Sequence, residues 1–264
     1  MKQLVISSSD NSQFKHWRKL AESSRACRLA RRSLAEGIHL AEVLLTAPVA
    51  VDAVIVRAGL GHGEALAMAQ TLAIAKGAVL VELAAPLYQA IAPVDNGTGP
   101  IVEFEIPASE WPQRAAVDAV YLAGLQEPGN VGTLIRTAAA AGVRHVLASA
   151  ETAYVWSPKV LRAGMGAHFA VQIHEGVAPE SIGHAFAAER LAADATGGRD
   201  LYAEDWGQGP TVWMLGSEGA GLSPAALAVA QRRLFIPIDS AVESLNVGAA
   251  AAICLFEQRR RRTR

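Results

Sequence analysis

Five polar residues lie in turns where an apolar run ends and a helix begins, and they are the side chains of this sequence best suited to chemistry. They are Asn130, Arg136, Glu218, Ser244 and Asn246. A short apolar run bounded by turn residues predicts a buried strand, and α/β proteins bind ligands outside the carboxyl ends of their parallel strands. If the three turns meet at one edge of a sheet, the five side chains form one site.

Each of these residues also has a structural role that competes with the chemical one. Asn130 is suited to cap a helix, and Ser244 and Asn246 are common turn formers. Arg136 lies among small residues, so its guanidinium is able to hold a phosphate or a carboxylate with two hydrogen bonds. The alternatives for Arg136 are an ion pair with a surface acid or with Glu218, and Glu218 is otherwise suited to orient a donor group.

The turn LGSEGAGLS, residues 215–223, is rich in glycine. It has no Lys-Ser or Lys-Thr pair and is therefore not a P-loop. Glycines at the end of a strand let a ligand approach the backbone closely, which suits a flat nucleoside.

A second glycine run suggests a different class of protein. Gly59, Gly61 and Gly63 follow a predicted strand, and Glu82 ends the next one, as in a dinucleotide site. However, the third glycine of that motif is replaced by Glu64, whose charge repels a pyrophosphate. An oxidoreductase is therefore the least favoured reading.

Short strands alternate with helices throughout the chain, which predicts an α/β fold. Residues 1–107 form a small α/β unit, and 108–118, which follow Pro107 and contain Pro112, form a linker. Residues 119–264 form a larger unit whose mostly parallel sheet has helices on both faces. The expected strands are 51–56, 78–83, 101–106, 120–125, 143–149, 169–173, 191–196, 211–216 and 233–238. The expected helices are 12–31, a helix ending near 45, 64–76, 86–91, 131–141, 158–163, 179–190, 224–232 and an alanine-rich C-terminal helix.

Composition excludes several classes. With 51% hydrophobic and 19% charged residues the chain can bury a large core. No apolar run reaches the roughly 18 residues that span a bilayer, and the N-terminus has no apolar signal region. Cys27 and Cys254 are the two cysteines, and the histidines show no paired metal spacing. We expect a cytoplasmic protein with no metal and no membrane partner.

Positive charge gathers at both ends of the chain. Residues 1–40 hold eight lysines and arginines against three acidic residues, and five arginines lie in the last seven residues. The helix expected at 12–31 interleaves these cations with Phe14 and Trp17, a pattern that suits RNA as well as a protein core. Basic ends on an acidic middle indicate a polyanionic partner; the alternative is that they only keep the chain soluble.

Three segments together resemble the signature motifs of the SpoU/TrmH family of RNA ribose 2′-O-methyltransferases. They are EPGNVGTLIRTAAAAG, LGSEGAGLS and IPIDSAVESLNVGAAAAICLFE, in that order, with SPKVLRAGMGAHFAVQI between the first two. Upstream, FKHWRKLAESSRACRLARRSLAEGIHLAEVLL resembles the substrate-binding domain common in that family, which is similar to ribosomal protein L30e.

The resemblance implies a SPOUT fold with a deep trefoil knot from about Thr211 onward, a homodimer, and S-adenosylmethionine as methyl donor. It implies rRNA or tRNA as the substrate and no DNA partner. Asn130, Arg136, Glu218, Ser244 and Asn246 match the family's catalytic polar positions. The residues expected to bind the cofactor are Leu215, Gly216, Gly219, Ile236, Ile238 and Leu245.

Two alternatives stay open from the sequence. One is a non-catalytic RNA-binding protein that retains the fold, and the other is methylation of a base rather than a ribose. Arg136 is the family's proposed activator, yet a guanidinium is a poor base. We therefore expect Arg136 to grip the phosphate beside the target ribose, while that phosphate or water accepts the proton.

Overall fold

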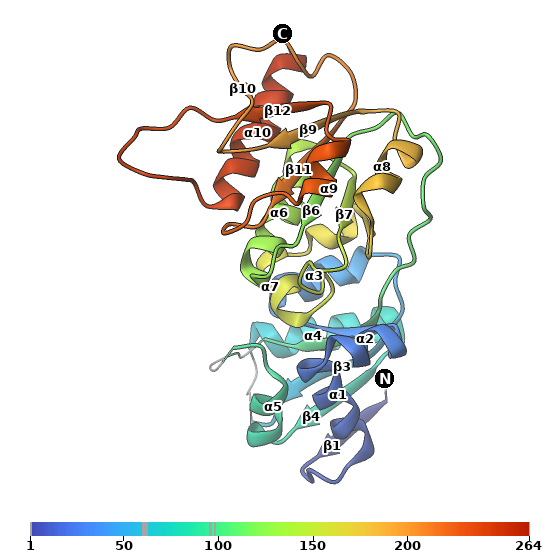
Figure 1. The fold of residues 1–264 in the computed structure, drawn as a ribbon. Coiled ribbons are helices and arrows are strands. Elements are labelled where there is room, and N and C mark those ends of the chain that lie inside the picture. The colour runs from blue at the N-terminus through green and yellow to red at the C-terminus, as the bar shows by residue number, and fades with distance from the viewer. Residues whose placement is uncertain (1, 60–62, 95–96, 98, 264) are drawn as a thin grey trace. The chain divides into compact units, whose positions relative to one another are not determined.

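The computed structural model describes residues 2–59, 63–94, 97 and 99–263, and it contains two compact units (Figure 1). The first unit comprises Met1–Ala108 and Trp156–Phe169, and the second comprises Ser109–Val155 and Ala170–Arg264. Residues 156–169 thus pack with the first unit, whereas the sequence predicted them as part of the larger domain, 119–264. That residues 1–107 form a substrate-binding domain and 119–264 a catalytic domain stays a prediction.

The first unit is built on a mixed five-stranded sheet in the order β1-β4-β3-β5-β2. β4 runs parallel to β1 and β3, whereas β5 runs antiparallel to β3 and β2. The strands are β1 Gln3–Ile6, β2 Arg32–Glu36, β3 Val51–Arg57, β4 Val79–Leu83 and β5 Ile101–Glu105. The helices are α1 Ser12–Glu22, α2 Ser24–Ala30, α3 Ile38–Thr46, α4 Glu64–Lys76 and α5 Ala85–Ile91. β1 was not predicted from the sequence, because only Ile6 of its four residues is buried and no alternation marks the strand.

The helix expected over 12–31 is wrong as a single element. Ser23 is extended, with φ −137° and ψ 111°, and its Oγ accepts a hydrogen bond from Ala26 N at 3.2 Å. A serine that caps the following helix interrupts the preceding one. Phe14 and Trp17 are 2% and 1% exposed, and Trp17 Nε1 donates to Glu103 Oε2 at 2.8 Å. These aromatic residues therefore belong to the core and are not surfaces on which RNA bases stack.

The segment from Trp156 to Phe169 packs within the first unit through aromatic rings and polar contacts. The rings of Trp156 and Phe169 lie 6.3 and 5.4 Å from that of Phe104, both edge-on. Ser33 Oγ donates to the Trp156 carbonyl at 2.5 Å. In the same unit the guanidinium of Arg162, on α7 Pro158–Gly164, hydrogen-bonds the buried carboxylate of Glu36.

The second unit is built on a seven-stranded sheet in the order β10-β12-β9-β11-β6-β7-β8. Every pairing in it is parallel, which confirms the expected sheet. The strands are β6 Ala119–Ala123, β7 His145–Ala148, β8 Gln172–His174, β9 Glu189–Ala193, β10 Arg199–Asp200, β11 Thr211–Gly216 and β12 Arg232–Phe235. The helices are α6 Pro128–Ala141, α8 Pro179–Ala185, α9 Pro224–Val229 and α10 Val247–Arg262. A 3-10 helix, Ala167–Ala170, begins in the first unit and ends at the first residue of the second part of this unit.

Helices cover both faces of this sheet, as expected. Along β11, Val212 and Met214 belong to a buried cluster with residues of α8 and α9. Trp213 points the other way, and its Nε1 donates to Gln258 Oε1 of α10 at 2.6 Å. α10 in turn packs against α6 (Figure 1). Successive side chains of a strand point to opposite faces of the sheet, so the apolar strand β11 contributes to the core on both sides.

Several expected ends were wrong by a few residues. The helix expected over 179–190 ends at Ala185, because Glu189 already begins β9. Between them, Ala187 N donates to the Ala115 carbonyl at 3.0 Å. The strand expected from 233 to 238 ends at Phe235, two residues before Pro237.

The arginines at the end of α10 make contacts within the second unit. Arg261 donates to the carbonyl oxygens of Leu201 and Glu204 at 2.8 and 2.7 Å, and its guanidinium lies 4.5 Å from the ring centroid of Trp206. Arg262 forms an ion pair with Asp118. These two side chains therefore hold the segment before β11 in place; that the basic tail contacts RNA stays a prediction.

In the part of the chain that the structure describes, no helix is both long and apolar enough to cross a membrane. Within the same described residues, no group of three or more His, Cys, Asp or Glu side chains is placed to hold a metal ion. Cys27 and Cys254 are free and buried. Of the second glycine run, Gly61 lies outside the described residues.

Candidate functional site

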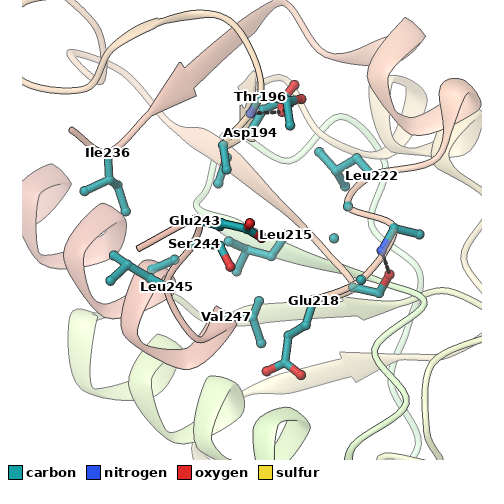
Figure 2. Close-up of a pocket in the computed structure, with 18 of the residues that line it drawn as sticks. Asp194, Thr196, Leu215, Glu218, Leu222, Ile236, Glu243, Ser244, Leu245 and Val247 are labelled. Carbon is teal, nitrogen blue, oxygen red and sulfur yellow. Dashed lines mark hydrogen bonds between the residues drawn. The ribbon is translucent and has the colours of Figure 1, made fainter. Parts of the chain in front are cut away.

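A cavity of about 520 Å³ lies where three neighbouring strands of the second sheet end (Figure 2). Residues just after the carboxyl ends of β9, β11 and β12 form its walls, and the start of α10 completes it. This is the edge at which α/β proteins bind ligands. The expected convergence of the second and third turns is therefore confirmed.

The walls are largely apolar and include every residue expected to contact a cofactor. Those residues are Leu215, Gly216, Gly219, Ile236, Ile238 and Leu245. Leu222 and Val247 extend the apolar surface. Ser244 and Glu218 also line the cavity, so the structure gathers residues that are up to 32 positions apart in sequence, from Leu215 to Val247. Their contact with a cofactor stays a prediction.

The glycines of the turn after β11 have two different functions. A Cβ atom on Gly216 would lie 2.2 Å from the carbonyl carbon of Gly221, which no side chain permits. This close approach lets Ser217 N donate a hydrogen bond across the turn to the Gly221 carbonyl at 3.1 Å. By contrast, a Cβ atom on Gly219 would meet nothing within 4 Å. Gly216 therefore closes the turn, and Gly219 leaves its backbone open to the cavity.

The carboxylate of Glu218 joins all three turns. Glu218 Oε1 accepts hydrogen bonds from Asn130 Nδ2 at 2.5 Å and from Asn246 Nδ2 at 2.9 Å. The two asparagines also contact each other, with Asn246 Nδ2 donating to Asn130 Oδ1 at 3.2 Å. Since these residues come from α6, the β11–α9 turn and α10, the cluster fixes the three segments relative to one another.

Only one of the two asparagines is a helix cap. Asn246 is the N-cap of α10, and its Oδ1 accepts from Gly248 N at 2.8 Å. Asn130 is not a cap, because α6 begins earlier, with Glu127 as the N-cap and Pro128 in the first turn. The cap expected at Asn130 is thus wrong, and its side chain is available to Glu218.

Arg136 does not line the cavity, and its side chain points to solvent. Among the described residues it forms no hydrogen bond or ion pair, so the alternative pairings with Glu218 or another acid are wrong. Arg136 follows Thr133 by three positions on α6, and residues so spaced share a helix face. Thr133 lies beside Gly248 at the start of α10, so Arg136 is on the side of α6 that faces this end of α10.

Sequence reasoning missed two polar residues of the cavity, Asp194 and Thr196. Glu243, in the same loop as Ser244, also lines the cavity and was not among the predicted site residues. Burial opposes ionisation of Asp194, but hydrogen bonds from Thr196 and Arg233 outweigh it, so the Asp194 pKa lies below its usual value. Arg233 Nε lies 2.7 Å from Asp194 Oδ2. Asp194 and Thr196 follow an ordinary apolar strand with no motif, so no local signal marks them.

The model of the SpoU rRNA Methylase family matches residues 119–256, which is more than half of the chain and includes all three turns. The chain belongs to the SpoU rRNA methylase family. Membership of this family excludes the alternative that the protein is an oxidoreductase.

Solved and curated members of the family are similar over the whole chain. A crystal structure of an rRNA methyltransferase from Sinorhizobium meliloti aligns with a TM-score of 0.84 and 27% identity, covering 99% of both chains. Its AdoMet-bound form aligns with a TM-score of 0.84 and 26% identity, covering 98% of both. The 23S rRNA (guanosine(2553)-2′-O)-methyltransferase RlmP of Bacillus subtilis is 28% identical over 96% of this chain and 98% of its own.

Other curated relatives are longer. Mouse mitochondrial rRNA methyltransferase 3 is 34% identical, and the match covers 52% of this chain and 44% of the relative. The chain thus spans about half the length of several curated relatives that it matches.

Proposed function

We propose that this protein transfers a methyl group from S-adenosylmethionine to a ribose 2′-hydroxyl of RNA. The observation that carries the proposal is the cavity built by the second and third motif turns of the SpoU family, which the Asn130–Glu218–Asn246 cluster joins to the first. The name of the B. subtilis relative specifies 2′-O-methylation of 23S rRNA, and the S. meliloti relative binds AdoMet. Both support the proposal.

The cavity fits S-adenosylmethionine in size and chemistry. About 520 Å³ lies within the range of small-molecule sites, which are mostly apolar with a few polar groups. Leu215, Ile236 and Leu245 offer apolar surface to an adenine, and the open backbone at Gly219 lets a flat ring approach. Gly216 and Ile238 complete the proposed cofactor set. When bound, the cofactor supplies a methyl group on a sulfonium sulfur.

The polar residues divide the remaining work. Asn130, Glu218 and Asn246 hold the turns in register, which aligns the two reacting molecules, and alignment is a large part of catalysis in two-substrate reactions. Ser244 offers a hydroxyl at the cavity wall. Arg136, exposed and without an ion pair in the described chain, grips the phosphate beside the target ribose. The 2′-hydroxyl proton then passes to that phosphate or to water.

The comparison of Arg136→Lys with the parent protein tests this role. If Arg136 grips phosphate, the substitution weakens RNA binding and leaves the shape of the pH–rate profile unchanged, because no titrating base has been lost. Loss of turnover with intact RNA binding would contradict the gripping role.

The remaining parts of the proposal concern partners and location. An rRNA or tRNA substrate binds through the predicted substrate-binding domain, residues 1–107, where α1 and α2 carry exposed cations such as Lys19 and Arg25. The protein acts as a homodimer in the cytoplasm, and the chain from Thr211 onward forms a trefoil knot around the cofactor. Light scattering measures the oligomeric state, and a monomer at micromolar concentration would contradict the dimer.

Isothermal titration with S-adenosylmethionine and S-adenosylhomocysteine tests the central claim. We expect micromolar binding that Leu245→Arg abolishes, because a guanidinium at the cavity wall excludes the ligand. Leu29→Arg is the matched control, since Leu29 is 77% exposed on α2 and lies outside the cavity. Transfer of tritium to rRNA or tRNA then identifies the substrate. A folded protein that binds RNA and neither cofactor form would instead be a non-catalytic RNA-binding protein.

A further inference from the structure

The cavity is acidic. Among its lining residues, as far as the structure describes them, Asp194, Glu218 and Glu243 are the ionisable ones, and none is a lysine, arginine or histidine. Carboxylates in a cleft with apolar walls attract cations more strongly than the same groups on an open surface, because low-dielectric walls focus the field. The charge of a ligand therefore affects how well this cavity holds it.

The three carboxylates are not equivalent. Asp194 is neutralised by Arg233, whose Nε and Nη2 lie 2.7 and 2.5 Å from Asp194 Oδ2. Glu218 accepts hydrogen bonds from two neutral amides, which hold it in place and leave its charge uncancelled. Its carboxylate is also committed to joining the three turns, so its orientation is fixed by structure.

Glu243 is the carboxylate that is free to respond to a ligand. It lies in the loop between β12 and α10, one residue before Ser244, and Figure 2 shows its side chain among the residues that line the cavity. Within the described chain it makes no hydrogen bond or ion pair. It shares the cavity wall with Leu215 and Leu245 and is exposed, so its charge is screened by water and not by a protein cation, and a high effective dielectric constant applies to it.

We infer that Glu243 makes the cavity prefer the cationic methyl donor to its neutral demethylated product; this inference rests on the function proposed above. In the transfer, the carbon–sulfur bond breaks and a carbon–oxygen bond to the 2′-oxygen forms. The sulfur keeps the electron pair and becomes a neutral thioether, and the hydroxyl proton leaves to phosphate or water. Attraction between Glu243 and the sulfonium exists before the transfer and vanishes after it, which favours release of the product.

Isothermal titration of the full chain measures this preference directly. A unit charge about 6 Å from a carboxylate, at an effective dielectric constant of about 40, is favoured about tenfold. We expect S-adenosylmethionine to bind about tenfold more tightly than S-adenosylhomocysteine. Sinefungin, which carries an amine in place of the methylated sulfonium, should bind like the donor. Glu243→Gln should weaken the two cationic ligands several-fold and leave S-adenosylhomocysteine unchanged.

Asp239→Asn is the matched control. It removes one negative charge from the same loop, but Asp239 does not line the cavity. Its Oδ1 accepts from Ala241 N at 2.8 Å, a contact that an asparagine retains. The donor-to-product ratio should therefore stay at the parent value in this variant.

The outcomes separate this inference from the proposed function. If both ligands bind the parent protein with a ratio that Glu243→Gln does not change, the inference is wrong and the methyltransferase proposal stands. Tighter binding of S-adenosylhomocysteine than of S-adenosylmethionine by the parent protein also overturns the inference. If neither ligand binds the folded parent protein, the proposed function fails and the inference fails with it.

Discussion

Replacing Arg261 tests whether the basic tail of α10 stabilises the fold or serves a polyanionic partner. The Arg261 side chain is only 15% exposed. It donates to the carbonyl oxygens of Leu201, Tyr202 and Glu204 at 2.7 to 3.2 Å. It also contacts Glu257 at 2.8 Å. Arg261→Met keeps an unbranched apolar stem beside Trp206 and removes every one of these polar contacts.

The cost of the substitution follows from these contacts. Hydrogen bonds to charged groups are worth roughly 1.5–3 kcal/mol each, and such losses do not add because the freed carbonyl groups regain water. Loss of the guanidinium above Trp206 adds up to about 1 kcal/mol. Glu257 keeps its partner Arg260, so its charge is not left unpaired. We expect Arg261→Met to lower the free energy of unfolding by about 3 kcal/mol.

Urea unfolding followed by circular dichroism measures the effect. With a slope of about 3 kcal/mol per molar urea for a chain of this size, the midpoint should fall by about 1 M. Arg259→Met is the control, because Arg259 is exposed and makes only a 3.5 Å contact with the Ala141 carbonyl. Its midpoint should match that of the parent. Equal midpoints for the two variants, with weaker RNA binding by Arg261→Met, would refute a structural role for Arg261.

Three further predictions concern acid stability, the glycine turn and the carboxylate cluster. The hydrogen bond from Arg260 lowers the Glu257 pKa from 4.5 to about 2. Because this folded-state pKa lies below the unfolded one, the ionised carboxylate stabilises the fold fully above about pH 5, and this stabilisation is lost as the pH falls toward 2. Discounted for the half-exposed Arg260, it amounts to about 2 kcal/mol, so unfolding free energy should depend less on pH in Glu257→Gln across that window. Gly216→Ala should weaken S-adenosylmethionine binding at least about tenfold, because the added methyl group meets backbone across the turn. Gly219→Ala should bind the same ligand with an affinity within about twofold of the parent protein. Equal affinities of the two variants would contradict the packing argument. Glu218→Gln should cost about 1 kcal/mol in urea unfolding, since the cluster is exposed to water and an amide oxygen accepts more weakly than a carboxylate, and an unchanged midpoint would show that the cluster does not join the turns.

The sequence by itself determined the class of fold and most of its elements. The helix Glu64–Lys76 and the strand Thr211–Gly216 were predicted to the residue. The helix ends at Gly77, which adopts φ +66° and caps it, and the strand is an apolar run between turn residues. Signals of this kind are local, because caps and periodicity act within a few residues. The family motifs are local in the same sense, and they identified the residues around the cavity.

Only the tertiary structure decided how polar and aromatic side chains are used. Glu218 lies 88 positions after Asn130 and 28 before Asn246, and the two asparagines are 116 positions apart, yet the three side chains form one cluster. Cations and aromatic residues that suited RNA from the sequence, such as Arg261 and Trp17, turned out to be bound within the fold. A polar or aromatic side chain has the same local pattern whether its partner is solvent, a ligand or a distant strand. Its role is set by the long-range contacts that folding creates, and those contacts leave no trace in the neighbouring sequence.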